Sequence, residues 1–452
     1  MTANPLIFRT YDIRGVFPTD INEDFALHVG KAFGTYLQKR GLSKCVLGRD
    51  DRQSSPTISK KVSEGLLSTG CDVVDVGITL TPLIHFFTSV EDFDAGINVT
   101  GSHNPINYNG IKFEFRHAVP FAGDNLKSLI GIMAEEKYAA GCGVYTTKDY
   151  LDLYIQCLQK QFKFTNNLSV LFDCGNGATS EISPKVAKAL GINLTPLDCT
   201  YDPDFPNGVP DPSNQEFMGV LSKKVVEAKA DVGFAFDTDG DRVGVVDEKG
   251  TVYKNDETLL LLAEDALKRF PGGKIIYDIK SSELVDSVIR EKGGIPTMMK
   301  TGRSFFLEEM KKGAILGSEL SGHTYFGGDY FGFDDGMYAA FRIIQILQEK
   351  GKKLSELMSN YPKRVASSEI KLPIEDCKKN DFLEKVVSLV KKSSEYAKVL
   401  YIDGVRAYIS NTGWFLVRVS GTSPYISIRY EGKDQEEYEL LQKKVEELLR
   451  QV

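Results

Sequence analysis

Residues 95–112 read Ala-Gly-Ile-Asn-Val-Thr-Gly-Ser-His-Asn-Pro-Ile-Asn-Tyr-Asn-Gly-Ile-Lys, and this stretch predicts both the fold class and the place of a reactive group. The mostly apolar run 95–99 is typical of a buried strand. Gly101 lets the backbone come close to a ligand, and the proline and the Asn-Gly pair that follow break regular structure, so Ser102 is expected on a loop with free backbone N–H groups. Open α/β sheets bind their ligands at the carboxyl ends of strands, which places a site at Ser102.

Two side chains in this stretch, His103 and Lys112, can place positive charge beside the serine. This setting suits a hydroxyl that accepts and gives up a phosphoryl group, because such transfer needs positioning and charge neutralisation more than covalent chemistry. A surface serine in a polar turn is the alternative interpretation of the same residues.

On both sides of this stretch, apolar runs typical of strands alternate with amphipathic segments typical of helices. Before it, we expect a loop at 8–15, helices at 24–38, 57–68 and 82–90, and strands at 45–48 and 72–76. The alternation restarts after residue 147 and again after residue 252. It indicates right-handed βαβ units around mainly parallel sheets.

Beyond Tyr361-Pro362 the pattern changes. Five strand-like runs between 365 and 430 alternate with two helical segments, which predicts an α+β domain with an antiparallel sheet. The chain has 452 residues, more than one hydrophobic core supports. We therefore predict four domains, at 1–147, 148–252, 253–363 and 364–452.

Composition excludes several classes of protein. Hydrophobic residues make up 42% and charged residues 26% of the chain, as in ordinary soluble proteins. The net charge of -7 argues against nucleic acid or an anionic membrane as a partner, so an anionic substrate must be met by local Arg and Lys. The first residues lack the features of a signal peptide and no apolar run is long enough to span a bilayer, which predicts a cytoplasmic protein.

The seven cysteines are scattered singly, without a Cys-x-x-Cys pair. For a chain of this length, this spacing favours reduced thiols over a disulfide framework.

Three carboxylates, Asp237, Asp239 and Asp241, lie between two strand-like runs within residues 231–247. Positions two apart in an extended loop point the same way, so their oxygens should converge, and a divalent cation would relieve the repulsion. Oxygen ligands with room for a phosphate oxygen favour Mg²⁺. A calcium EF-hand loop is the rival reading, but Arg242 stands where that loop needs glycine and the flanks read as strands.

Residues 418–424 read Arg-Val-Ser-Gly-Thr-Ser-Pro and lie between the last two predicted strands. The planar guanidinium of Arg418, three hydroxyl groups and a backbone made flexible by Gly421 favour a phosphate-binding loop over a plain hairpin turn. Residues 318–323, Ser-Glu-Leu-Ser-Gly-His, carry groups that hydrogen-bond sugar hydroxyls. The alternative interpretation is that His323 is a structural histidine of the core. Arg14, Lys280 and Arg303 are further candidate phosphate contacts just outside predicted strands or helices.

Taken together and in order, these stretches resemble the α-D-phosphohexomutase family, most closely its phosphomannomutase/phosphoglucomutase members, over nearly the whole chain. The resemblance implies three similar mixed-sheet α/β domains plus a smaller C-terminal α+β domain around a central active-site cleft. It also implies reversible phosphoryl transfer between C1 and C6 of mannose or glucose phosphates, through a phosphoserine enzyme and a hexose 1,6-bisphosphate. The implied cofactors are Mg²⁺ and glucose or mannose 1,6-bisphosphate, and the expected oligomeric state is a monomer or weak homodimer.

The resemblance also implies roles for individual residues. Ser102 is the implied phosphoserine, which joins Asp237, Asp239 and Asp241 around the metal, with His103, Lys112 and Arg14 as the other catalytic candidates. The implied substrate-binding residues are Tyr11, Arg242, Lys280, Gly302, Arg303, Glu319, Ser321, His323, Arg418, Ser420, Gly421 and Thr422. Arg303 departs from the family, because many members carry histidine in a Thr-Gly-His sequence there.

Three alternatives stay open at the level of sequence. A phosphoglucosamine mutase would share these motifs, although its usual opening sequence differs from Phe-Arg-Thr-Tyr-Asp-Ile-Arg-Gly at 8–15. A serine-dependent metallophosphatase would need Ser102 and the aspartates but neither the Glu319 loop nor the Arg418 loop. A non-catalytic sugar or metal binding protein would carry no phosphate on Ser102.

Overall fold

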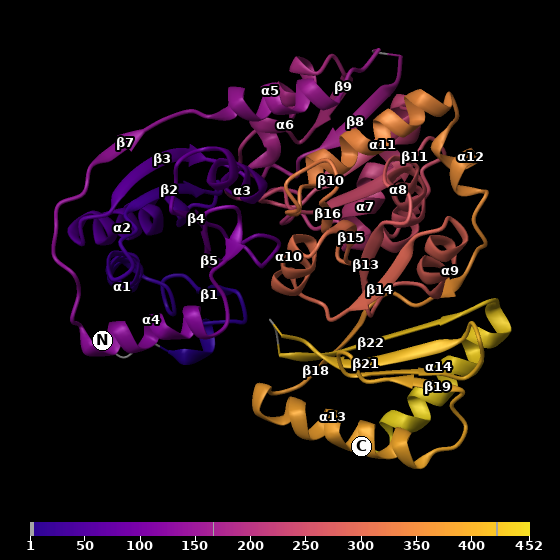
Figure 1. Cartoon of the computed structure of the whole chain (residues 1–452). Coiled ribbons are helices and arrows are strands. Elements are labelled where there is room, and N and C mark those ends of the chain that lie inside the picture. Colours follow the sequence, from indigo (N-terminus) through magenta and orange to yellow (C-terminus); the bar gives the residue numbers. More distant parts are fainter. Residues whose placement is uncertain (1–3, 166, 422–423) are drawn as a thin grey trace.

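The computed structural model describes residues 4–165, 167–421 and 424–452. Within these ranges the strands form four sheets, which follow one another in chain order (Figure 1). Residues from the domains of all four sheets line one cavity. The predicted fold class, three α/β domains with mixed sheets and a smaller α+β domain, is confirmed.

The first domain contains a seven-stranded sheet in the order β1-β5-β4-β2-β3-β7, with β6 paired to β5. β4, β2, β3 and β7 run parallel, whereas β5 is antiparallel to both β1 and β4. α1, α2 and α4 pack together, and α3 lies against β2 and β4. The elements are η1 (Pro5–Ile7), β1 (Asp12–Val16), α1 (Glu23–Gln38), β2 (Lys44–Arg49), α2 (Ser55–Ser68), β3 (Asp72–Ile78), α3 (Thr81–Val90), β4 (Ala95–Val99), β5 (Tyr108–Phe115), β6 (Val119–Pro120), α4 (Asp124–Glu135) and β7 (Tyr145–Thr147).

The loop expected at 8–15 was wrong for β1, and β5, where the Asn-Gly pair was expected to break regular structure, was not predicted as a strand. Asp12 of β1 pairs with Lys112 of β5, so the segment after the serine loop returns directly into the sheet. Gly110 permits this, because a Cβ there would lie 2.5 Å from the carbonyl oxygen of Ile13 and 2.9 Å from that of Thr100. The Asn-Gly pair therefore allows the backbones of neighbouring strands to approach closely and does not form a turn.

The second and third domains are smaller sheets of the same kind. The second has the order β12-β11-β10-β8-β9, and the third β14-β13-β15-β16. The second contains α5 (Leu151–Gln161), β8 (Ser169–Asp173), α6 (Thr179–Ala189), β9 (Asn193–Leu197), α7 (Gln215–Ala228), β10 (Val232–Phe236), β11 (Val243–Asp247) and β12 (Val252–Tyr253). The third contains α8 (Asn255–Arg269), β13 (Lys274–Asp278), α9 (Glu283–Glu291), β14 (Ile295–Met299), α10 (Arg303–Lys311), β15 (Ala314–Ser318), β16 (Thr324–Phe326), α11 (Gly336–Lys350) and α12 (Leu354–Met358).

One hydrophobic core runs under both of these sheets. α11 follows the third sheet in sequence yet packs on β10 and β11 of the second. The ring of Phe341 on α11 lies 6.3 Å from that of Phe172 on β8. The two domains therefore share their interior. The predicted domain limit at 252/253 falls inside β12, and the exact limits stay a prediction.

The fourth domain is an antiparallel sheet in the order β17-β22-β21-β20-β19, with β18 also paired to β22. It docks on the third domain through the fully buried Arg406, whose Nη1 donates to the carbonyls of Ile279 at 2.7 Å and Ser281 at 2.8 Å. The elements are β17 (Val365–Ala366), β18 (Ile370–Pro373), η2 (Asp376–Lys378), α13 (Lys379–Lys392), β19 (Lys398–Leu400), β20 (Val405–Tyr408), β21 (Trp414–Val419), β22 (Tyr425–Gly432) and α14 (Gln435–Leu449).

The cysteines depart from expectation at one place. Cys174 and Cys199 form a disulfide that joins the loop after β8 to the segment after β9. The expectation that all seven thiols are reduced was therefore wrong for this pair, because the parallel pairing of β8 with β9 brings residues 25 positions apart together. The other five cysteines are free.

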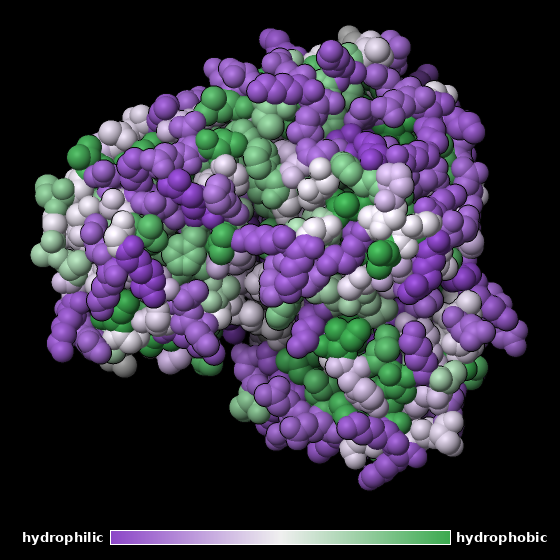
Figure 2. Space-filling model, in the orientation of Figure 1, coloured by the Kyte–Doolittle hydropathy of each residue, from purple (hydrophilic) through white to green (hydrophobic). Residues whose placement is uncertain are grey.

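The surface shown in Figure 2 is mostly hydrophilic and is hollowed between the lobe that carries α4, at lower left, and the fourth domain, at the bottom. None of the helices in the described part of the chain has the length and apolar character that a membrane span requires.

Candidate active site

Ser102 lies in the turn between β4 and β5, buried just beneath the wall of the central cavity. Its φ of 47° falls in the left-handed region that residues other than glycine rarely adopt. The buried guanidinium of Arg52 supports this turn, since its Nη2 donates to the carbonyl oxygens of Ser102 and Asn104, both at 2.6 Å. A Cβ at Gly101 would lie 2.4 Å from Arg52 Nε, which explains the glycine before the serine.

The hydroxyl of Ser102 points at the aspartate loop of the second domain. Its Oγ donates to Asp237 Oδ2 at 3.1 Å and lies 3.1 Å from His103 Nδ1. Burial and the nearby Arg242 guanidinium hold the pKa of His103 well below its usual range, so the imidazole is neutral. A neutral base and a carboxylate thus flank the serine oxygen.

The three predicted metal ligands, Asp237, Asp239 and Asp241, lie in the turn between β10 and β11 and are almost completely buried. Lys112 of β5 reaches across from the first domain, and its Nζ donates to Asp239 Oδ2 at 2.6 Å and to Asp241 Oδ2 at 2.8 Å. Thr81, at the start of α3, donates to the same Asp239 oxygen at 2.5 Å. The first and second domains therefore meet through charges at the site itself.

Burial and the charges of Asp241 and Asp239 raise the pKa of Asp237 well above its usual range. Burial is the largest influence on Asp239 and Asp241 and raises the pKa of each, but the Lys112 ammonium, together with Thr81 at Asp239 and His323 at Asp241, outweighs it and both pKa values are lowered. Burial lowers the pKa of Lys112, yet the two carboxylates more than compensate and raise it. Lys112 is therefore the cation that balances two of the three carboxylates.

These residues fit a divalent cation. One oxygen from each of the three aspartates lies within 4.8 Å of the others. Asp239 Oδ1 and Asp241 Oδ1 are buried and accept no hydrogen bond from the residues that the structure describes. Buried carboxylate oxygens without partners are costly, and an all-oxygen donor set is the kind that Mg²⁺ prefers.

A cavity of about 860 Å³ lies above this centre and is lined by residues of all four domains. Most of the predicted contacts line it: Tyr11, Arg14, His103, Arg242, Lys280, Gly302, Arg303, Glu319, Ser321, His323, Arg418, Ser420 and Gly421. Ser102, Lys112 and the three aspartates lie directly beneath, at most 8% exposed. Thr422 lies outside the described residues.

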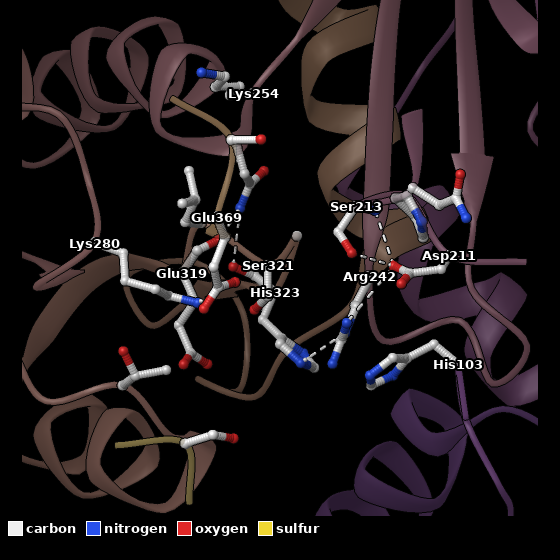
Figure 3. A pocket seen from close by; sticks show the side chains of 18 of the residues that line it. His103, Asp211, Ser213, Arg242, Lys254, Lys280, Glu319, Ser321, His323 and Glu369 are labelled. Atoms are coloured by element: carbon white, nitrogen blue, oxygen red, sulfur yellow. Dashed lines mark hydrogen bonds and ion pairs between the residues drawn. The ribbon is translucent and has the colours of Figure 1, made fainter. Parts of the chain in front are cut away.

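Arg242 and His323 meet within the cavity, and His103 lies beside them on the first domain's loop (Figure 3). Arg242 Nε donates to His323 Nε2 at 3.1 Å, and His323 Nδ1 lies 2.8 Å from Asp334 Oδ2. This pair of contacts assigns the imidazole proton to Nδ1. His323, a residue of the third domain, therefore orients the guanidinium of Arg242 over the site.

The carboxylate of Glu319 is held from both sides. The backbone N–H of Gly302 donates to its Oε1 at 2.8 Å, and the Tyr325 hydroxyl donates to its Oε2 at 2.7 Å. The remaining lone pairs of a carboxylate so fixed can accept hydrogen bonds from sugar hydroxyls in the cavity. Lys280, 3.5 Å from Glu369, lies on the same side (Figure 3).

Arg303, where the family pattern often has histidine, makes ionic and hydrogen-bond contacts with other protein side chains. Its Nε donates to Asp334 Oδ1 at 2.8 Å, and its Nη2 contacts His85 of the first domain. His85 in turn contacts Glu114 on β5. Arg303 lines the cavity but engages its guanidinium in a buried network between the first and third domains, so its predicted contact with substrate stays a prediction.

Sequence reasoning missed several supporting residues, chiefly Arg52, Thr81 and Asp334. Each acts through a contact more than 10 positions distant in sequence, such as Arg52 to the serine loop or Thr81 to Asp239. The position of Arg52 just after β2, at a strand's carboxyl end, was the one available signal.

Comparison with known proteins agrees with this arrangement. Sequence models of phosphoglucomutase/phosphomannomutase alpha/beta/alpha domains I, II and III and of the C-terminal domain match residues 5–140, 148–250, 254–365 and 369–448. A phosphomannomutase/phosphoglucomutase of Pseudomonas syringae pv. tomato is 38% identical over 96% of this chain and 93% of its own length. A probable phosphoglucosamine mutase of Pyrococcus abyssi is 33% identical over 98% of this chain and 97% of its own length.

The solved structures include a close match. The crystal structure of a phosphoglucomutase/phosphomannomutase family protein from Burkholderia thailandensis superposes with a TM-score of 0.92 at 34% identity, covering 99% of this chain and 97% of that one. Matches of this extent and identity span all four domains. The chain therefore belongs to the phosphoglucomutase/phosphomannomutase family.

Proposed function

We propose that this chain is a phosphohexomutase that interconverts the 1- and 6-phosphates of glucose and mannose, with Ser102 as the phosphoryl carrier. The observation that carries the proposal is the position of the Ser102 hydroxyl, 3.1 Å from Asp237 beneath a cavity whose other wall holds Glu319 and Arg418. A hydrolase needs only the first of these features. A mutase also needs to hold the sugar and its second phosphate.

The first transfer breaks the bond between phosphorus and the oxygen of phosphorylated Ser102 and forms one to the free hydroxyl of a hexose monophosphate. The sugar hydroxyl loses its proton and the freed Ser102 oxygen gains one, so no net proton is released, and the product is a hexose 1,6-bisphosphate. His103 is the neutral group beside the serine oxygen and is suited to take or return a proton there, whereas Lys112 and Arg14 remain protonated and supply positive charge. The bisphosphate then turns end over end and returns its other phosphoryl group to Ser102.

Asp237, Asp239 and Asp241 would hold Mg²⁺, together with an oxygen of phosphorylated Ser102. The ion would supply charge neutralisation at the transferred phosphoryl group. Lys112 would lose part of its pairing with Asp239 and Asp241 when the ion binds. Free glucose or mannose 1,6-bisphosphate would act as activator, because it can phosphorylate a serine that has lost its phosphate.

The turn of the intermediate limits what the sugar site can recognise. The useful contacts lie near the middle of the ring, at the 3- and 4-hydroxyls, since these keep similar places in both orientations. Glu319 and Ser321 line the cavity where such contacts are needed, and Arg418 with Ser420 would bind the phosphate that does not react. Glucose and mannose differ at C2, so we expect both to be accepted.

The decisive experiment assays glucose, mannose and glucosamine 1-phosphates side by side, following both the 6-phosphate product and inorganic phosphate. Turnover of glucose and mannose phosphates with little phosphate release supports the proposal. A marked preference for glucosamine phosphate would identify the phosphoglucosamine mutase alternative, and release of inorganic phosphate would identify a phosphatase. Intact mass of the purified chain, before and after treatment with the bisphosphate, reports a phosphoryl group on Ser102.

We further propose that the enzyme acts as a monomer or weak homodimer, because one chain supplies all the cavity residues discussed above. Light scattering over a range of protein concentrations tests this. We propose a cytoplasmic location, which the five free cysteines favour and which the Cys174–Cys199 disulfide opposes.

A further inference from the structure

Asp403 belongs to none of the motifs discussed above, yet it contacts the arginine proposed to bind the distal phosphate. It lies in the turn between β19 and β20 and lines the cavity. Its Oδ2 accepts a hydrogen bond from Arg418 Nε at 2.8 Å. An arginine held at Nε keeps both of its Nη groups available for a bidentate contact with phosphate, and no described residue accepts a hydrogen bond from those groups.

The turn that carries Asp403 is built to lie against Arg418. Gly404 has a φ of 81°, and a Cβ there would lie 2.3 Å from the carbonyl oxygen of Val417 and 2.7 Å from Arg418 Cα. Any other residue would push the turn off β21 and carry the carboxylate away from the guanidinium. The contact between Asp403 and Arg418 is thus fixed by the backbone as well as by charge.

The same carboxylate oxygen also joins the fourth domain to the third. Asp403 Oδ2 accepts from the backbone N–H of Thr301 at 3.2 Å. The next N–H of that loop, from Gly302, donates to Glu319 Oε1 at 2.8 Å. Two successive backbone N–H groups therefore hold two carboxylates: that of Asp403, which contacts Arg418, and that of Glu319, which faces the proposed sugar site.

We propose that Asp403 is a positioning residue that aims Arg418 at the non-reacting phosphate and keeps it in register with Glu319 across the boundary between the third and fourth domains. This inference rests on the proposed function for the identity of the ligand, a sugar phosphate. Asp403 itself does not contact phosphate, because two anions would repel. Its effect on binding is exerted through Arg418 and the 300–303 loop.

The test compares Asp403→Asn with Glu384→Gln, which also removes one negative charge but lies exposed on α13, outside the cavity lining. We expect Asp403→Asn to raise KM for glucose 1-phosphate about 10-fold and change kcat by less than about 3-fold, because it weakens binding in ground and transition states alike. Glu384→Gln should match the wild type. The Kd of glucose 6-phosphate, measured by calorimetry, should rise in parallel with KM.

A double-mutant cycle separates positioning from a general structural role. If Asp403 acts through Arg418, adding Asp403→Asn to Arg418→Lys should change KM by less than about 2-fold, whereas independent effects would multiply. Should Asp403→Asn fail to fold, Asp403→Glu tests the contact, because it keeps the charge but displaces the carboxylate by one methylene group, and it should reproduce the rise in KM.

An unchanged or lowered KM and Kd in Asp403→Asn would overturn the inference, since it would show that the carboxylate only repels the phosphate. Multiplicative effects in the cycle would overturn it equally. The calorimetric arm needs no turnover, so a wild-type protein that binds glucose 6-phosphate without isomerising it would refute the proposed function and still decide the role of Asp403.

Discussion

The two ends of the central cavity are built differently. At one end, which we call the serine–aspartate centre, Ser102, Lys112, Asp237, Asp239 and Asp241 are buried and already in contact with one another. At the other, the recognition edge, Glu319, Ser321, Arg418 and Ser420 line the cavity, and the charges of Glu319 and Arg418 are each held by a separate partner, Tyr325 and Asp403. Several buried carboxylates cannot stay close together without a cation, so the charges of the first end are compensated within the protein, whereas the side chains of the second end are separate and face the space where a ligand binds.

This contrast predicts where substitutions act. Changes in the serine–aspartate centre should affect chemistry, metal affinity and stability together. Changes at the recognition edge should affect binding and leave the fold intact.

Ser102→Ala should lower mutase turnover by roughly 10³-fold or more, because it removes the hydroxyl proposed to carry the phosphoryl group. Steady-state assays with glucose 1-phosphate measure the loss, and circular dichroism verifies the fold. Ser287→Ala, an exposed serine on α9, is the matched control and should retain full activity. A Ser102→Ala enzyme with more than a few per cent of wild-type turnover would remove Ser102 from the proposed mechanism.

Lys112→Met should lower the free energy of unfolding of the metal-free protein by about 3 to 5 kcal/mol, because it leaves Asp239 and Asp241 buried without their cation. Saturating Mg²⁺ should restore most of that loss and stabilise this variant more than the wild type, in which the ion competes with the ammonium. Denaturant unfolding with and without Mg²⁺, beside exposed Lys185→Met as control, measures both effects. Equal stabilisation by Mg²⁺ in all three proteins would show that Lys112 and the ion do not share a site.

Glu319→Gln should lower kcat/KM for glucose and mannose 1-phosphates by about 10- to 100-fold, with the thermal midpoint of unfolding nearly unchanged. The amide keeps one acceptor oxygen but loses the charge that strengthens hydrogen bonds from sugar hydroxyls. Glu308→Gln, on the exposed face of α10, is the control. A large loss of stability without a change in kinetics would show that Glu319 stabilises the fold and does not bind the sugar.

Asp51→Asn should stabilise the protein at pH 8 by about 1 to 3 kcal/mol and have little effect near pH 4. Burial, with the adjacent Asp50 charge, raises the pKa of Asp51 from its usual value near 3.8 to about 7. The folded state therefore binds this proton more tightly than the unfolded state, and the stability it contributes is lost as pH rises through about 7. Urea unfolding of both proteins at several pH values isolates the effect, and parallel stability curves would contradict it.

The residues that carry charge in the serine–aspartate centre were readable from the sequence because each motif is local. Three aspartates two positions apart converge in any extended turn, and a serine after a buried strand is placed by the strand. The helices and central strands of the α/β domains were likewise predicted, since their apolar periodicity is a property of consecutive residues.

Other elements were missed where the deciding contact is distant. β1 was expected to be a loop and β5 was not predicted as a strand, because both contain glycine and polar residues; the pairing of β5 with β1 and with β4 outweighs that local preference. β9, an exposed edge strand that contains Pro196, gives no strand signal of its own. The Cys174–Cys199 disulfide depends on the pairing of β8 with β9 in the same way.

The sequence by itself determined the family, the four-part organisation and the reactive groups, because these depend on short runs of residues whose chemistry is local. Only the tertiary structure decided which groups serve each other: Lys112 as the cation for two aspartates, Arg52 as the support of the serine turn, and Asp403 as the partner of Arg418. The physical reason is that charge pairing and hydrogen bonding act over a few ångströms in space, and separations of tens of residues along the chain leave no pattern that reveals them.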